Sequence, residues 1–311
     1  MYDIRPAAHA DLDAVTALIL RLQADDAHHI GYLGETLGDV AEELAEFEPD
    51  WPSCTVVATD DSGRVCGALS VEVDAELRRA FLHGPFVDVP VNHPAGSRIW
   101  DQTADALYAA ALPLFGDVAD RELLGHTGHR RLAAFAERHG FSAARPCGIH
   151  TLAGDGLRNL LLREASCPRT GPAREMRVLP TDPAVHEAVR VLHDRCFPRT
   201  HLSGRTLVDG RKGYTVVVAM DGDRVLGYAS GKADPGEYYV DFVAVEPDVR
   251  GNGVGAALVT ELVWKLAERA GARPQAAAAI LAGNRSSQRL FERLGFRLHL
   301  ELVAYRVGRA A

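Results

Sequence analysis

The spacing of apolar residues divides the chain into short strands and amphipathic helices. Runs rich in β-branched residues occupy positions 55–58 and 215–218, and each leads through a turn with Asp and Gly to a second apolar run at 64–67 or 224–227. Extended runs joined by such a turn form β-hairpins. Other strands are followed by segments of helical periodicity, so the chain contains both strands and helices.

The strongest local signal lies at positions 238–266. A strand at 238–245 ends in a turn, and Gly251, Gly253 and Gly255 follow it. Glycines let an anion approach backbone N–H groups closely, and a helix N-terminus carries unpaired donors and a partial positive charge. The segment therefore predicts a diphosphate-binding loop. Apolar residues at helical spacing show that a helix begins there: Leu258, Val259, Leu262, Val263 and Leu266.

Three kinds of phosphate loop compete for this segment. A Walker P-loop requires Gly-Lys-Ser/Thr, whereas Gly255 is followed by Ala256 and Ala257. A dinucleotide loop fits better, since Gly251, Gly253 and Ala256 satisfy G-x-G-x-x-A, but it requires an acidic residue after the next strand. The next apolar segment, 275–282, contains no acid. The dinucleotide loop therefore stays a minor alternative to the third kind, an acyl-CoA loop.

Two motifs resemble those of the GNAT superfamily of N-acetyltransferases. Positions 250–255, RGNGVG, match the signature Arg/Gln-x-x-Gly-x-Gly/Ala. Asn284, Ser287 and the segment 290–296, LFERLGF, are similar to a second signature, whose helix covers the pantetheine arm of CoA. The two motifs stand in the family's order and spacing, which is much more specific than either motif by itself.

The two halves of the chain repeat each other. The hairpins are related by a constant offset of 160 positions, and FAERHGF at 135–141 returns as LFERLGF at 290–296. A period this long indicates two whole domains. We expect a first domain at 1–153, a linker at 154–172 that contains Gly, Pro, Ser and Thr, and a second domain at 173–311.

The repeat is asymmetric at the glycine loop. In the first half, positions 86–97 contain Pro90, Pro94 and a single glycine, Gly96. Proline has no N–H to donate, so a diphosphate would find a poorer site there. We therefore expect the first domain to be a degenerate copy that has lost the acyl-CoA site, and the second to bind the cofactor.

Composition favours a cytoplasmic enzyme without a metal. The 311 residues make about two domains of roughly 150 each, and no apolar run reaches the roughly 20 residues of a membrane span. Five cysteines without a C-x-x-C pair indicate neither a disulfide framework nor a zinc site, and His126 and His129 lack a third ligand. The formal charge of −8 argues against nucleic acid as a partner.

The family resemblance implies a fold and a co-substrate. Each half should be a GNAT-like mixed α/β sheet whose two central strands splay apart, with acetyl-CoA in the gap. The tandem arrangement resembles two-domain members such as mycothiol synthase. By the same resemblance the cofactor is bound by strand, loop and covering helix through Phe242, Val243, Ala244, Val245, Arg250, Gly251, Asn252, Gly253, Val254, Gly255, Ala256, Asn284, Ser287 and Phe291.

The strand also offers candidates for the general base. Many relatives carry a glutamate near its start, and Tyr239 stands at that place here. Alternation puts Glu237, Tyr239 and Asp241 on one face, so Asp241 or Glu237 is expected to accept the amine proton.

The residue at the position of the general acid differs from the family's pattern. The family's tyrosine corresponds to Phe291, which cannot donate a proton, although Ser286, Ser287 or Tyr305 could supply a hydroxyl.

The sequence thus predicts an enzyme that transfers the acetyl group of acetyl-CoA to a primary amine of a small molecule or protein. The alternative is a non-catalytic acyl-CoA-binding or sensing module, which Phe291 and the missing strand glutamate favour. No pattern in the sequence identifies the amine, the oligomeric state or the task of the first domain.

Overall fold

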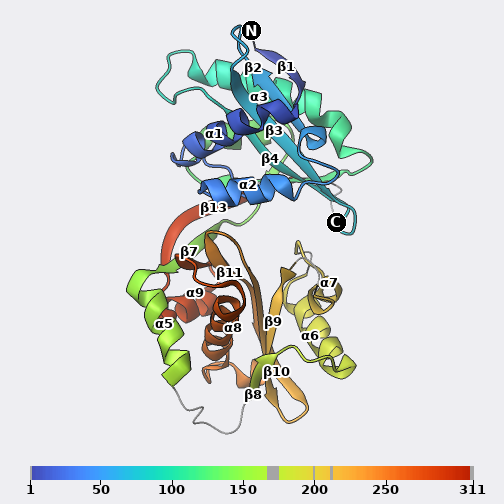
Figure 1. The fold of residues 1–311 in the computed structure, drawn as a ribbon. Coiled ribbons are helices and arrows are strands. Elements are labelled where there is room, and N and C mark those ends of the chain that lie inside the picture. The colour runs from blue at the N-terminus through green and yellow to red at the C-terminus, as the bar shows by residue number, and fades with distance from the viewer. Residues whose placement is uncertain (1, 167–174, 199, 211–212, 309–311) are drawn as a thin grey trace. The chain divides into compact units, whose positions relative to one another are not determined.

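The computed structural model describes residues 2–166, 175–198, 200–210 and 213–308 (Figure 1). Its contacts divide the chain into two compact units. The first consists of Met1–Cys147 with Leu300–Ala311, and the second of Gly148–His299. None of the described helices is long and apolar enough to cross a membrane.

The first unit is a sheet of order β1-β2-β3-β4-β5-β13, with only β4 and β5 parallel. Side chains of four helices share one apolar core with it. Its elements are β1 (Asp3–Pro6), η1 (His9–Asp11), α1 (Leu12–Gln23), α2 (Leu37–Ala45), η2 (Pro52–Cys54), β2 (Thr55–Thr59), β3 (Val65–Asp74), β4 (Arg79–Val87), α3 (Gly96–Ala111), η3 (Leu112–Phe115), β5 (Asp120–His126), α4 (Arg130–Arg138), β6 (Ser142–Ala143) and β13 (Arg297–Val307).

The second unit has the corresponding order β7-β12-β11-β10-β9-β8, with β11 and β12 parallel. Helix α8 packs on one face of this sheet and α6 with α7 on the other, around two separate apolar cores (Figure 1). Its elements are β7 (Cys147–Ala153), α5 (Gly154–Ser166), β8 (Glu175–Val178), α6 (Pro183–Cys196), α7 (Gly204–Val208), β9 (Thr215–Asp221), β10 (Arg224–Ala233), β11 (Glu237–Val245), η5 (Pro247–Val249), α8 (Val254–Ala270), β12 (Gln275–Leu281) and α9 (Arg285–Leu294).

The last strand of the chain completes the first unit. In β13, Leu302 to Val307 pair antiparallel with β5, and Val303 and Tyr305 are buried in the first unit's core. Strand β7 lies beside β12 instead, and its Leu152 joins a core of the second unit. The compact units therefore differ from the expected ranges 1–153 and 173–311. The repeat predicts that these strands exist, but an alternating strand can pair with either sheet edge.

The expected linker, 154–172, is largely a helix. Residues 154–166 form α5, and Leu157 and Leu160 are buried in a core of the second unit. Apolar residues three and four apart give this segment a buried face, which outweighs its glycines. The remainder of the expected linker, 167–172, lies outside the described residues.

The duplication extends to single side chains. Helix α4 is capped by His129, whose Nδ1 accepts the Leu132 N–H at 3.2 Å, and α9 is capped by Asn284, whose Oδ1 accepts the Ser287 N–H at 3.2 Å. His129 is 1% exposed, and burial lowers the pKa of its imidazole to about 3. The ring is thus neutral at neutral pH, as an accepting nitrogen requires.

We expect Tyr305→Ala to destabilise the first unit although residue 305 is near the chain's end. Deleting a buried aromatic ring costs about 3–5 kcal/mol. Hydrogen exchange should therefore accelerate in β2 and β3 more than in α8. The matched control is Leu298→Ala on the same strand, because Leu298 is 55% exposed and its loss should change stability by less than about 0.5 kcal/mol. Faster exchange confined to α8 would contradict the assignment of β13 to the first unit.

We expect His129→Asn to weaken the loss of stability in acid. The imidazole titrates near 6.5 in the unfolded chain and at about 3 in the folded one, so the unfolded chain binds more protons between these values. The free energy of unfolding therefore falls as pH decreases through this window. Below roughly pH 5.5 the free energy of unfolding of the wild type should fall by about 1.4 kcal/mol per pH unit more than that of the variant. The variant keeps a capping oxygen, because asparagine can accept the same N–H. Urea titrations at several pH values measure the two slopes, and equal slopes would contradict the argument.

Candidate active site

The centre of the second unit's sheet is open. Strands β11 and β12 pair in parallel only from Glu237 with Gln275 to Val240 with Ala278, and within the described residues no pairing between them continues beyond that point. The β12 side of 241–245 therefore lacks a strand partner. Unpaired backbone groups along an extended strand can bind an extended ligand in the way a further strand would.

A β-bulge marks the residue at which the strands part. Ser230 of β10 lies opposite Phe242 and Gly231 opposite Val240, so Asp241 is the extra residue of β11. The close approach demands glycine at position 231, since a Cβ there would lie 2.0 Å from the Tyr239 carbonyl oxygen. The bulge thus places Asp241 directly after Val240, where the gap between β11 and β12 begins.

The glycine loop connects this strand to α8 (Figure 1). Gly251 and Gly253 both have φ of 80°, a left-handed conformation that suits glycine, and no side chain caps the helix. The first N–H groups of α8, at Val254, Gly255 and Ala256, have no acceptor within the helix. Arg250 Nε donates to the Val245 carbonyl at 2.9 Å and ties the loop to the end of β11. The loop can therefore present several donors to an anion.

The second sequence motif forms α9, and its residues have visible structural roles. Asn284 caps the helix by accepting the Ser287 N–H. Phe291 is 4% exposed and packs edge to face on Phe296 at 5.0 Å. Leu290 approaches the loop, because a Cβ at Gly255 would lie 3.4 Å from its side chain. The motif therefore holds a helix against the glycine loop, and the buried Phe291 ring has no proton to donate.

Of the two proposed bases, the structure places Asp241 at the gap and Glu237 away from it. Both are on the same face of β11, as the alternation predicts. Glu237 accepts a hydrogen bond from Gln275 Nε2 at 3.0 Å, where the strands are still paired. Four residues of strand, about 13 Å, separate it from Asp241.

Two residues that the sequence analysis missed contact Asp241. The Tyr214 hydroxyl donates to Asp241 Oδ2 at 2.5 Å, and His201 Nε2 lies 2.8 Å from the same oxygen. Burial and the neighbouring carboxylate raise the pKa of Tyr214, so its hydroxyl stays a donor. Neither residue is in a recognisable motif, because His201 is in the connection between α6 and α7 and Tyr214 immediately precedes β9.

The corresponding loop of the first unit is filled by a side chain of that unit, Arg131 of α4. Arg131 donates to the carbonyls of Val89, Pro90 and Val91 at 2.7, 3.1 and 3.3 Å. A Cβ at Gly96, the first residue of α3, would lie 2.6 Å from the Arg131 guanidinium. This cation and the carbonyls it binds occupy the space beside the helix N-terminus, which is consistent with the asymmetry expected from the two prolines.

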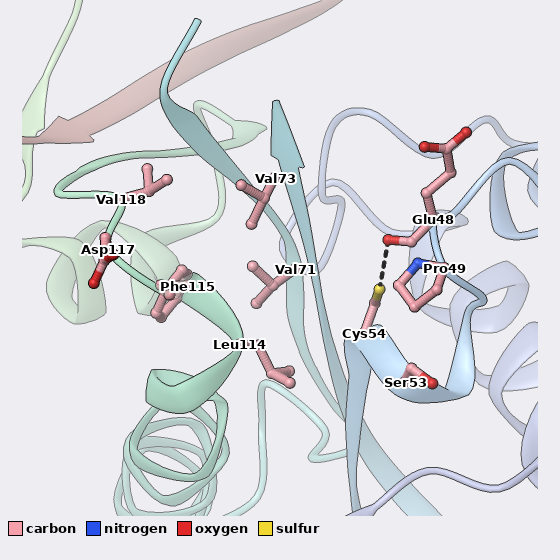
Figure 2. Close-up of a pocket in the computed structure, with 11 residues that line it drawn as sticks. Glu48, Pro49, Ser53, Cys54, Val71, Val73, Leu114, Phe115, Asp117 and Val118 are labelled. Carbon is pink, nitrogen blue, oxygen red and sulfur yellow. Dashed lines mark hydrogen bonds between the residues drawn. The ribbon is translucent and has the colours of Figure 1, made fainter. Parts of the chain in front are cut away.

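Two cavities lie elsewhere in the part of the chain that the structure describes. One of about 360 Å³ in the first unit is lined by Val71 and Val73 of β3 and by Phe115, and there the Cys54 thiol donates to the Glu48 carbonyl (Figure 2). Another of about 230 Å³ in the second unit is lined by residues that include Thr215, Ala233 and Leu266. Neither includes the glycine loop or Asp241. The candidate site is defined instead by the strand edge at 241–245 and the N-terminus of α8.

Metal ligation is not apparent at either site. In the part of the chain that the structure describes, no group of three or more His, Cys, Asp or Glu side chains is arranged to hold a metal ion. His126 and His129 serve as local acceptors, with His126 Nδ1 accepting the Gly128 N–H at 3.0 Å and His129 Nδ1 the Leu132 N–H at 3.2 Å.

Known proteins share this architecture. Residues 185–296 match the sequence model of the Acetyltransferase (GNAT) family. A search of curated proteins gives no match. Among solved structures, a GCN5-related N-acetyltransferase from Sphaerobacter thermophilus is 19% identical, with a TM-score of 0.68 over 99% of this chain and 95% of that one. A tandem GNAT protein from the clavulanic acid biosynthesis pathway is 16% identical, with a TM-score of 0.65 over 100% of this chain and 99% of that one.

At these identities the structural neighbours establish the fold alone, while the family match covers the strand, the glycine loop and the covering helix of the second unit. The fold, two GNAT-like mixed sheets, is as the sequence predicts. Residues 185–296 of the second unit thus match the GNAT acetyltransferase family, and the whole chain has the fold of two-domain GNAT proteins.

Proposed function

We propose that the second unit transfers the acetyl group of acetyl-CoA to a primary amine of a small molecule or protein. The observation that carries this proposal is the continuity of the unpaired strand 241–245 with an uncapped, glycine-lined helix N-terminus. An extended pantetheine arm needs the first feature, and a diphosphate needs the second. Arg250 and the N–H groups of 251–256 would hold the diphosphate, and Asn284, Ser287 and Phe291 would flank the arm.

The reaction requires a polarised thioester and an acceptor for the amine proton. Backbone N–H groups at the gap would stabilise the developing oxyanion. Asp241 is the carboxylate at that place, and Glu237 is the second candidate for the proton. CoA is a tolerable leaving group as its thiolate, since a free thiol has a pKa of about 8.5, so Phe291 does not preclude transfer.

A non-catalytic acyl-CoA-binding or sensing module is the second candidate function. The buried Phe291 in place of a proton donor and Tyr239 at the place of the usual glutamate favour it. Release of free thiol from acetyl-CoA in the presence of a panel of primary amines separates the two. Tight binding of acetyl-CoA with no release for any amine would support the sensing module. The net charge of −8 supports a cationic amine rather than a nucleic acid as the partner, and we propose a cytoplasmic location.

We expect acetyl-CoA to bind once per chain. Only the second unit has an open loop, since Arg131 fills that of the first. Titration calorimetry should give a stoichiometry near one. Two equivalent sites per chain would show that Arg131 moves aside and that the first unit is not degenerate.

We expect Gly255→Asp to abolish CoA binding without unfolding the protein. A Cβ at this position meets only ordinary contacts, the nearest at 3.4 Å from Leu290. A carboxylate in the first turn stabilises a helix but repels a diphosphate. The dissociation constant should rise at least about 100-fold, roughly 2.7 kcal/mol, with an unchanged or higher Tm. Gly255→Ala, the neutral control, should bind nearly as the wild type, and equal losses in both would contradict an electrostatic cause.

A further inference from the structure

The histidine beside Asp241 comes from the segment between α6 and α7. Its Nε2 lies 2.8 Å from Asp241 Oδ2, and its ring stacks on Phe242 with centroids 5.2 Å apart and an interplanar angle of 26°. Its Nδ1 lies 3.4 Å from the Thr200 hydroxyl. These three contacts together orient the His201 ring.

Asp241 and His201 differ in access to a substrate. The Asp241 side chain is 6% exposed, and both of its described partners meet Oδ2. The His201 side chain is 48% exposed. An incoming amine needs a partner that it can reach, and of this pair His201 is the accessible one.

The neighbouring groups favour a protonatable ring at this place. Asp241 and Tyr214 face it from β11 and from the residue before β9. On α6, His193 is buried between the Tyr228 hydroxyl at 2.6 Å and the Leu202 carbonyl at 2.9 Å, and burial lowers the pKa of His193. On the same helix, Asp194 pairs with Arg190 at 3.2 Å and Arg195 pairs with Glu246 at 2.7 Å, so each of these arginines has a carboxylate partner. A neutral His193 and the carboxylates leave an imidazolium at His201 electrostatically acceptable.

We propose that His201 accepts the proton of the attacking amine and that Asp241 is its positioning residue. The proposal rests on the acetyl transfer proposed above. Asp241 accepts from Nε2–H and so fixes the tautomer in which Nδ1 has the lone pair.

The amine nitrogen forms its bond to the acyl carbon, and the carbon–sulfur bond breaks with its electron pair on the CoA sulfur. The surplus proton on nitrogen passes to His201 Nδ1, and from there it neutralises the thiolate or enters solvent. The sequence suggests Asp241 as the base itself. In this proposal Asp241 acts through His201 and does not receive the proton directly.

The test compares full-length variants by thiol release with a fixed panel of primary amines: an alkylamine, an arylalkylamine, an amino sugar and a lysine-containing peptide. His201→Gln should lower kcat by about 10²–10³, leave the Kd for acetyl-CoA unchanged, and remove the acidic limb from the pH profile of kcat/KM. Asp241→Asn should keep that limb but move its midpoint to lower pH, because the imidazolium loses its carboxylate partner. His186→Gln is the matched control, since Nε2 of His186 on α6 contacts the Pro180 carbonyl at 2.7 Å rather than Asp241.

The outcomes separate the two proposals. If His201→Gln retains the wild-type rate and acidic limb while Asp241→Asn loses the limb, Asp241 is itself the base and the inference about His201 is overturned. If the wild type binds acetyl-CoA and releases no thiol with any amine, the proposed function fails and the inference fails with it. Should His201→Gln not fold, the shift of the limb in Asp241→Asn decides the question, because a purely structural Asp241 would leave the midpoint where it is.

Discussion

The site depends on one constraint, the parting of two parallel strands after four pairs. Strands β11 and β12 are held together as far as Val240 and Ala278, and the bulge at Asp241 turns the ladder away from that point. Backbone polar groups that lose a strand partner must be satisfied by water, side chains or a ligand. The gap is therefore an edge to which an extended ligand can bind. The open N-terminus of α8 and the polar group at Asp241 are useful only because both border this gap.

The first unit has a similar gap between parallel strands, but a different loop borders it. Strands β4 and β5 also pair over four residues, from Arg79 with Asp120 to Leu82 with Leu123. The two units therefore share the backbone geometry on which a GNAT site is built. They differ in the loop, where a guanidinium binds carbonyls in one unit and N–H groups remain open in the other. The same backbone architecture can thus border two loops with different polar groups.

Much of this was predictable because it resides in local sequence. The glycine loop, the strand before it, the helix after it and the duplication all follow from residue types at fixed spacings, and the left-handed φ of Gly251 and Gly253 is a local requirement. The partners of Asp241 were not predictable, since His201 and Tyr214 come from 40 and 27 positions away and belong to no periodic pattern. The destination of β13 was missed for a similar reason: alternation specifies a buried face, but it does not specify which strand lies next.

The completion of the first unit by β13 has a consequence for synthesis on the ribosome. When β5 leaves the exit tunnel, its native neighbour at 302–307 has not been made. At about 5–20 residues per second the wait is on the order of ten to thirty seconds. During that time the edge of β5 is unpaired, and β7, the next long strand to emerge, competes for it. The nascent chain therefore passes through a stage at which the first unit lacks its final strand, because that strand is synthesised only after the whole of the second unit.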